Sequence, residues 1–408
     1  MIRHQVYFDT LGSHQEESAS WRSVFAGLSV LRLVDSYVDA APGSAPPNWA
    51  QLHTVRAAVD DVPEGDSVRG VLSCALDELG TRGVVDETVC TALMSYGRAL
   101  DYEANWALAA DVFATVARIA RPERFPRLAV EAYVCVGGSA RRNGDWEISA
   151  RAYSQAAYIA DTLGDRSGVL TVQVGIANTY MAKGNLPQAM TILDDVVMQA
   201  KDLSLTEVES IALHSRSSLA QRRGDTMDAV RLAHEALVLT KAPAVRDAVL
   251  EDIAVAFSGL GMHDAARDAH LLLTMTAQAK FVRWQAAINL MEMASMEGME
   301  AAFDTYARDM RREPMGPWLK SYFLLFLGEG LERFGRIDAA RAALEEAVVF
   351  SAANQIHAVT FKAESDLVAL RSAVRTKPAP PIFSEPSEHV LSAAHAISEL
   401  RRAAFSPA

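Results

Sequence analysis

The sequence predicts an all-α protein built from stacked pairs of helices, and three observations support this fold class. A short motif centred on glycine recurs along the chain at nearly constant spacing, which is the signature of a repeat architecture. Apolar residues on both sides of each glycine recur every three to four positions, the period of a helix with one buried face. Only 23 glycines and 15 prolines occur among 408 residues, and this low content predicts long elements with few turns.

The recurring motif is a glycine followed about five positions later by a small residue. Its glycines are Gly144, Gly184, Gly224, Gly261 and Gly335. The first three spacings are 40, 40 and 37 residues, and the last interval of 74 residues is twice 37. We therefore predict an intervening unit, which Met299–Tyr306 fits in degenerate form. The segment 104–113 fits one step earlier without the glycine, and Gly65 is a weaker candidate, so the series contains six or seven units.

Each unit predicts two helices joined at the glycine. Before Gly335, the residues Leu324, Leu327 and Leu331 form one apolar stripe, and a second stripe follows each glycine. Glycine suits the left-handed conformation that ends many helices, and an Asp or Asn after it can cap the next helix. The small residue five positions later allows two helices to pack closely. We expect a series of helix-turn-helix units.

These residues resemble the tetratricopeptide repeat (TPR) family. In the unit around Gly184, the likeness covers Ile176, Ala177, Tyr180, Asn185, Ala189 and Leu193. The unit is longer than the family's usual 34 residues and is similar to the roughly 40-residue subclass of kinesin light chains and Pins-like adaptors and to TPR arms of bacterial regulators. The resemblance spans residues 87–351. It implies a right-handed α-α superhelix, a TPR solenoid, of about six to seven repeats with helical caps.

The two ends of the chain differ from the repeats in composition. We expect a helical capping subdomain over 1–86, a solenoid over 87–351, a capping helix over 352–376, a Pro-rich linker over 377–386 and an amphipathic helix over 387–408, because terminal units must seal the ends of a stack. Two alternatives remain for the last helix. It packs as a cap on the last repeat, or it folds into the groove of its own or a second protomer as a self-inhibitory ligand.

Charge and cysteine content exclude several functions. The chain has 39 Lys and Arg against 51 Asp and Glu, a formal charge of −12. A nucleic-acid surface needs clustered cations, so we expect no direct nucleic-acid partner. Three cysteines without a CxxC pair favour a reducing cytoplasm. The most apolar stretch falls short of the roughly 20 residues that cross a bilayer, so we expect a cytoplasmic protein with no membrane contact.

The sequence also lacks the common catalytic motifs. It contains no P-loop, no HExxH and no GxSxG string, and its ten histidines are scattered, with no cluster of cysteines or carboxylates beside the pair His263 and His270. We therefore predict a non-catalytic protein without cofactor or metal. A helical enzyme that uses residues 1–86 is an alternative that no motif supports.

The resemblance implies that the first helix of each repeat lines a concave groove, the face with which solenoids bind their partners. Projecting the family's groove positions onto this sequence gives the candidate residues Arg98, Tyr102, Arg141, Arg142, Asn178, Met181, His214, Ser218, Gln221 and Arg222. Asn178 stands where the family places an asparagine that holds the ligand backbone. Later units place acidic or apolar residues such as Glu251, Val255 and Glu329 at these positions.

Four of the candidates are arginines, which could form a cationic strip. Guanidinium groups pair with carboxylates at two points, so the strip predicts a ligand bearing Asp or Glu. Alternatively, these arginines only neutralise nearby acids. The resemblance thus predicts a non-catalytic TPR scaffold or adaptor that binds a partner protein or peptide segment, and the strip suggests an acidic one. The alternative function is a regulatory or sensory TPR protein that binds a small peptide or metabolite.

Overall fold

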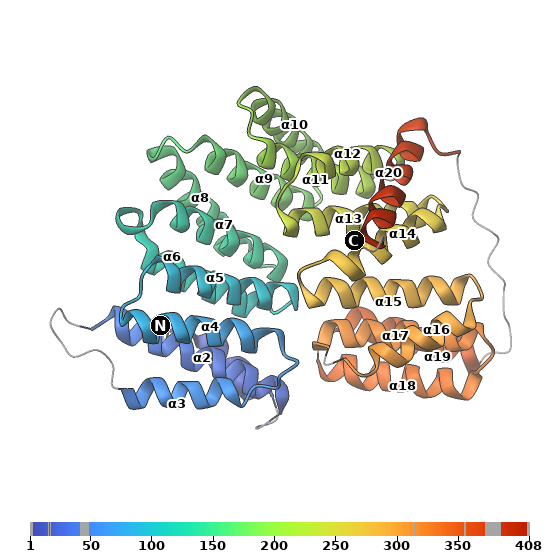
Figure 1. Cartoon of the computed structure of the whole chain (residues 1–408), viewed down its shortest axis with the longest axis horizontal. Coiled ribbons are helices and arrows are strands. Elements are labelled where there is room, and N and C mark those ends of the chain that lie inside the picture. Colours follow the sequence, from blue (N-terminus) through green and yellow to red (C-terminus); the bar gives the residue numbers. More distant parts are fainter. Residues whose placement is uncertain are drawn as a thin grey trace. The chain divides into compact units, whose positions relative to one another are not determined.

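The computed structural model describes residues 3–14, 16, 18–40, 49–313, 315–354, 356–371 and 385–405. These residues form twenty helices and no strand (Figure 1), so the all-α prediction is confirmed. The chain divides into two compact units, residues 1–185 and 186–408. Each unit is described by itself.

The first unit contains nine helices. They are α1 (Gln5–Ser13), α2 (Ala19–Val38), α3 (Trp49–Asp60), α4 (Ser67–Arg82), α5 (Glu87–Tyr102), α6 (Trp106–Arg124), α7 (Pro126–Asn143), α8 (Trp146–Thr162) and α9 (Arg166–Ala182). Each helix contacts the next, and α5, α7 and α9 also contact one another in order. This is the contact pattern of stacked helix hairpins. One hydrophobic core runs along the stack from Tyr7 to Val172.

The second unit continues the same hairpin pattern. Its helices are α10 (Leu186–Asp202), α11 (Thr206–Arg223), α12 (Thr226–Leu239), α13 (Pro243–Gly259), α14 (His263–Thr276), α15 (Lys280–Met296), α16 (Glu300–Met310), α17 (Pro317–Arg333), α18 (Ile337–Ala353), α19 (His357–Arg371) and α20 (Glu388–Phe405). Contacts join α11 with α13, α15 with α17 and α17 with α19. The two units therefore share a TPR-like helical-repeat fold.

The turns inside the hairpins lie where the glycine series predicts them. All five glycines of the series have positive φ angles, between 74° and 85°. The predicted intervening unit is present as α15 and α16, with Gly298 at φ 73° between them. At the turn before α6, Ala104 adopts φ 60° without being glycine. The repeat spacing therefore predicted this turn correctly, although alanine is not a residue type that indicates a left-handed turn.

The N-terminal helix α1 has no counterpart in the sequence prediction. It begins after His4, a residue in the left-handed conformation with only 4% of its surface exposed. His4 Nδ1 lies 2.6 Å from Asp111 Oδ2, and Tyr7 of α1 donates a 3.1 Å hydrogen bond to Tyr96. α1 contacts α2 and α6, so a buried charge pair and a tyrosine pair hold it on the stack.

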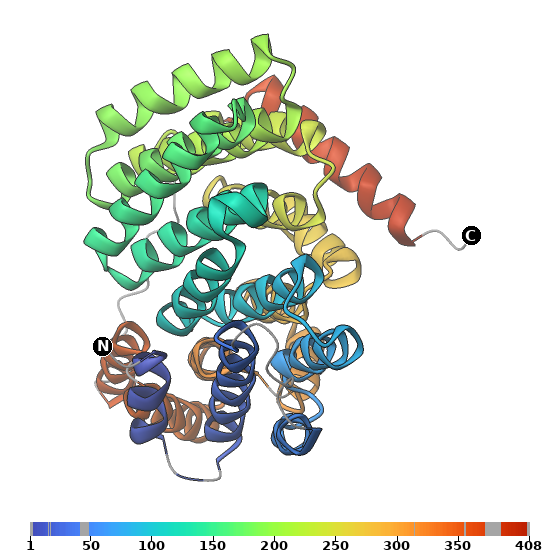
Figure 2. The ribbon, with the colours of Figure 1, turned by 90° about the vertical axis from the view of Figure 1, so that its left-hand side faces the viewer.

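The C-terminal helix α20 corresponds to the predicted amphipathic helix, but it packs elsewhere than either alternative proposed. Its main contacts are with α14 and α12, which are second helices of their hairpins (Figure 1, Figure 2). The groove alternative requires the first helices, and the cap alternative requires the last repeat. Most of the predicted linker, residues 377–384, lies outside the described residues. Among the helices that the structure describes, none combines the length and apolarity needed to span a membrane.

Candidate partner-binding surface

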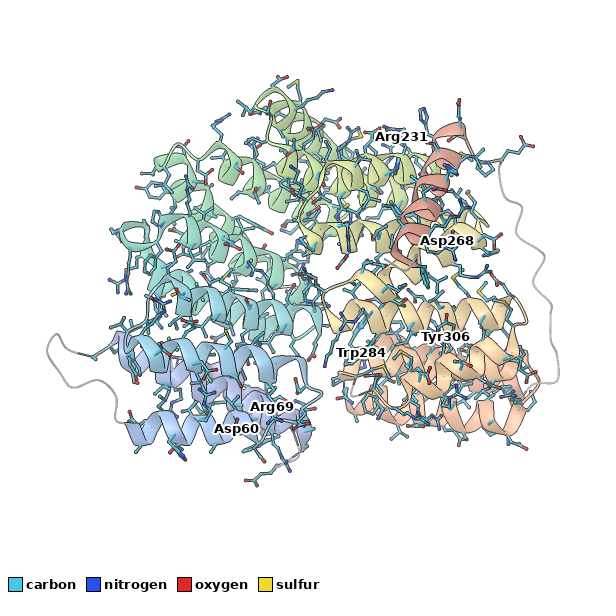
Figure 3. The ribbon with its side chains drawn as sticks, in the orientation of Figure 1. Asp60, Arg69, Arg231, Asp268, Trp284 and Tyr306 are labelled. Atoms are coloured by element: carbon cyan, nitrogen blue, oxygen red, sulfur yellow. The ribbon has the colours of Figure 1, made fainter. Side chains whose placement is uncertain are left out.

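The candidate surface in each unit is formed by the first helices of consecutive hairpins. We call it the first-helix face. It comprises α5, α7 and α9 in the first unit, and α11, α13, α15, α17 and α19 in the second. Residues three, four and seven positions apart on one helix share a face, so each first helix presents one stripe. Figure 3 shows the side chains of both units.

In the first unit, two candidate arginines pair with carboxylates of a neighbouring first helix. Arg98 of α5 pairs with Glu131 of α7. Arg142 of α7 donates to both carboxylate oxygens of Asp101 on α5, and Ser139 donates to the same carboxylate at 2.7 Å. Exposed pairs of this kind contribute about 0–1 kcal/mol each. Arg98 and Arg142 thus have carboxylate partners within the chain, as the second interpretation of the arginines expected.

Arg141 lies in a different environment from its neighbour Arg142. Its side chain is half-buried beside the Tyr153 hydroxyl of α8, and burial lowers the pKa of its guanidinium and raises that of the Tyr153 phenol. Its Nε has no hydrogen-bond partner within the described part of the chain. Arg141 therefore differs from Arg98 and Arg142, which each pair with a carboxylate of a neighbouring helix.

The other candidates in the first unit differ in exposure. Tyr102 is 37% exposed at the C-terminal end of α5, and Asn178 is half-buried on α9. Met181 is only 7% exposed, so its side chain packs within the helix stack and we leave it out of the proposed surface. The projection assigned groove positions from their place in the repeat alone, so it did not account for the packing of Met181.

In the second unit, all four candidates lie on α11, and two of them contact α13. His214 Nε2 and Ser218 Oγ both lie 2.9 Å from Asp252 Oδ2 of α13. The Gln221 side-chain oxygen is buried without a hydrogen-bond partner among the described residues. Arg222 is exposed on α11. Arg222 belongs to the second unit and the other three arginines belong to the first. The cationic strip of all four arginines therefore stays a prediction.

The same face continues with carboxylates, of which the sequence analysis placed Glu251 and Glu329 at groove positions but not Glu292. Gln285 of α15 donates to Glu251 of α13, and burial, with Asp252 nearby, raises the pKa of Glu251 to about 7. Burial also raises the pKa of Glu292 on α15, with Glu329 of α17 adding to the effect. Glu292 was missed because its repeat was recognised only in degenerate form. Aligning α15 from Gly298 would have placed it on this face.

At the far end of this face, α17 and α19 carry a mixed cluster. Glu329 accepts from Lys362 at 2.8 Å and from Arg333 at 3.2 Å, and Arg333 also donates to Ser295 of α15 at 2.8 Å. Lys362 pairs in addition with Asp366 at 2.6 Å. Consecutive first helices are thus joined by side-chain contacts along this part of the unit.

The arrangement offers hydrogen bonds and charges rather than a reactive centre. Among the residues that the structure describes, no group of three or more His, Cys, Asp or Glu side chains is placed to hold a metal ion. Burial raises the pKa values of Cys90 and Cys135 to about 12, which makes these two thiols poor nucleophiles. These faces can position a ligand by polar contacts along several helices.

Comparison with known proteins does not assign this chain to a family. No family model matches the chain, and no curated protein matches it. Among solved structures, the chain is similar to one described as the crystal structure of the APC/C hetero-tetramer Cut9-Hcn1. The identity is 13%, the match covers 98% of this chain and 74% of that chain, and the TM-score is 0.49. The assignment to helical hairpin repeats rests on the turn positions and helix contacts described above.

Proposed function

We propose that this chain is a non-catalytic scaffold that binds segments of a partner protein along its first-helix faces. The observation that carries the proposal is that, within each unit, polar side-chain pairs at the protein surface join consecutive first helices. These pairs are Asp101–Arg142, Asp252–His214, Glu251–Gln285 and Glu329–Lys362. Their partners already fix their geometry, so a ligand segment lying across several helices meets donors and acceptors that need little reordering.

The charge of each face suggests a different ligand. In the first unit, the guanidinium of Arg141 is half-buried, and its Nε has no hydrogen-bond partner among the described residues, which favours an acidic side chain on the bound segment. In the second unit, Glu251 and Glu292 are half-buried carboxylates whose pKa values are raised by burial and like charge. A cation would relieve that repulsion, so this face favours a basic or neutral segment. Complementary charge contributes mainly to specificity and association rate.

Site-specific photo-crosslinking in a native lysate tests the binding face. A crosslinker in place of Arg142 or Ser218 should capture the same partner protein, because both positions lie on first-helix faces. The control position is Arg151, which is exposed on the second helix α8. Capture from Arg151 alone, or equally from all three positions, would contradict the assignment of the first-helix faces.

Charge reversal then tests which ligand each face prefers. The double variant Arg141→Glu/Arg142→Glu should weaken binding of the captured partner by about tenfold or more, as should Glu251→Lys/Glu292→Lys for a partner held by the second unit. Arg151→Glu and Asp195→Lys are matched controls, since both residues are exposed on second helices. Unchanged affinity for both double variants would exclude this function.

The alternative function, a regulatory protein that binds a small peptide or metabolite, makes a different prediction. It requires a thermal shift with a small ligand and no macromolecular crosslink.

From the resemblance of the repeats, we further propose membership of the roughly 40-residue TPR subclass and a cytoplasmic location. Fractionation of cells expressing the tagged chain tests the location.

A further inference from the structure

The C-terminal helix α20 packs on helices that lie far from it in the sequence. It begins at Glu388, whereas its partners α12 and α14 end at Leu239 and Thr276. Figure 1 shows α20 crossing these helices, and Figure 2 shows it beside them from the second direction. Because α19 ends at Arg371, residues 372–387 connect α20 to the rest of the chain. Because α20 is so far from α12 and α14 in the sequence, we treat their contact as the docking of one helix on a separate surface.

The contact is built from one stripe of small and β-branched residues. Val390, Ala393 and Ile397 are all 0% exposed and belong to the same hydrophobic cluster as the α12 and α14 side chains. Ala394 and Ala404 pack at the edge of that cluster. Positions 390, 393, 394, 397 and 404 fall on one side of a helix. The alanines of the stripe allow close packing against a helix pair that itself presents alanines.

A polar contact fixes the direction of α20 on this surface. Arg401 Nε lies 3.0 Å from Asp268 Oδ1 on α14, and Figure 3 labels Asp268 beside the end of α20. The carboxylate is 18% exposed and the guanidinium 32% exposed, so the pair is partly shielded from water. Reversing the helix would separate these charges. The surface therefore recognises a helix by an apolar stripe and by an arginine near its C-terminal end.

The surface does not depend on α20 for its own construction. α12 is held by α11 and α13, and α14 by α13 and α15. Most helical stability in proteins comes from tertiary packing of an apolar face, so α20 gains most of its order from docking. The two sides of the contact thus behave as a preformed site and a tethered ligand.

We propose that this surface of α12 and α14 is a helix-docking site on which the α20 of a second copy can replace the chain's own. A second copy carries the identical stripe and the identical arginine, so reciprocal exchange preserves every contact, including Arg401–Asp268. Such exchange is a low-cost route to dimers. Because the chain's own helix is covalently attached, it competes with the helix of a second copy, so exchange increases as the protein concentration rises.

The first experiment asks whether the site accepts α20 that is not tethered. In the full chain, Ile397→Asp places a charge at a fully buried position and should release α20 from the surface. A fluorescent peptide of residues 385–405 should then bind this variant at least about tenfold more tightly than the wild-type chain, whose site is occupied. Leu391→Asp is the matched control, because Leu391 is 53% exposed on the same helix. The control chain should behave as wild type.

The second experiment asks whether a second copy is the occupant. Sedimentation equilibrium of the wild-type chain and of Leu391→Asp should show an average mass that rises towards that of a dimer with concentration. Ile397→Asp should stay monomeric, and circular dichroism should show that it keeps its helices. If Ile397→Asp loses its helices, Arg401→Glu, at a partly exposed residue, replaces it in both measurements.

Two results would overturn the proposal. If the peptide does not bind a folded, α20-released chain, the surface is not a docking site. If the peptide binds but the wild-type chain stays monomeric up to concentrations near the millimolar range, the site serves only the chain's own helix and the second copy is excluded.

Discussion

The two units use the same packing device with different side chains. In the first unit, Tyr153 of α8 fills the space beside Gly175 of the following first helix, where an added Cβ would lie 2.3 Å from the ring. In the second unit, Phe303 of α16 does the same beside Gly330, at 2.2 Å. Both rings are almost fully buried. The same contact of an aromatic ring against a glycine thus occurs in both units, whereas the chemistry at the edge of the ring differs.

That edge is where the two first-helix faces diverge. The Tyr153 hydroxyl lies beside Arg141 and brings a half-buried cation onto the first face. Phe303 has no polar group, and the second face instead carries half-buried carboxylates such as Glu251. The overall charge of −12 therefore hides two local environments. We propose that individual residues on this shared scaffold, and not the fold, set the ligand preference of each face.

Removing either ring should have the largest effect on stability. Tyr153→Ala and Phe303→Ala should each lower the free energy of unfolding of their own unit by about 3–5 kcal/mol, because each leaves a cavity in a stack with no other filler. Hydrogen exchange of α7–α9 and of α15–α17 measures the two effects separately. Losses below about 1 kcal/mol in either unit would show that the rings are not equivalent.

Two buried histidines should give the units opposite responses to pH. Burial alone would lower the pKa of His4, but Asp111 and Asp35 outweigh it and raise the value to about 9. Its contribution is fully present below about pH 6.5 and is lost as pH rises to about 9. Burial lowers the pKa of His270 in the second unit to about 4, so that contribution is present above about pH 6.5 and is lost as pH falls.

Each of these contributions is at most about 3 kcal/mol, from about 1.4 kcal/mol per pKa unit. Hydrogen exchange of each unit between pH 4 and 9 measures them. His4→Gln should flatten the alkaline side in the first unit only, and His270→Leu the acid side in the second only. A flat alkaline profile in the wild-type chain would contradict the buried, charged state of His4.

A smaller change should separate the packing role of Tyr153 from its polar role. Tyr153→Phe copies the arrangement in the second unit and keeps the ring, so it should cost only about 1.5–3 kcal/mol, the loss of the hydrogen bond to the charged Arg141. Denaturant unfolding measures the cost. Binding of the captured partner should also change, since Arg141 loses its neighbour. Equal losses for Tyr153→Phe and Tyr153→Ala would mean that the hydroxyl dominates.

The smallest effect concerns the turn that lacks its glycine. Ala104→Gly should raise the melting temperature, because φ 60° is costly for alanine and readily adopted by glycine. The expected gain is about 0.5–1 kcal/mol after the greater flexibility of glycine in the unfolded chain is subtracted. Gly184→Ala, at φ 80°, should have the opposite sign. A loss of stability in Ala104→Gly would contradict the strained turn.

The candidate surface was only partly predictable from the sequence. The projection of groove positions found His214 and Ser218, which meet at Asp252, but it also selected the buried Met181. It could not show that Arg98 and Arg142 already have carboxylate partners, because those carboxylates lie 33 and 41 residues away in the chain. α1 was missed, since its short segment has no clear periodicity and is ordered by burial of Tyr7.

The sequence by itself determined where the repeated hairpins turn. Helix period and left-handed turns depend on residues within a few positions of one another, so the glycine series located even the turn at Ala104. Only the tertiary structure decided which charges meet and where α20 packs. Those outcomes depend on side chains brought together from distant segments, and the stripe of α20 fits the α12 and α14 surface for reasons of shape and charge that no local pattern encodes.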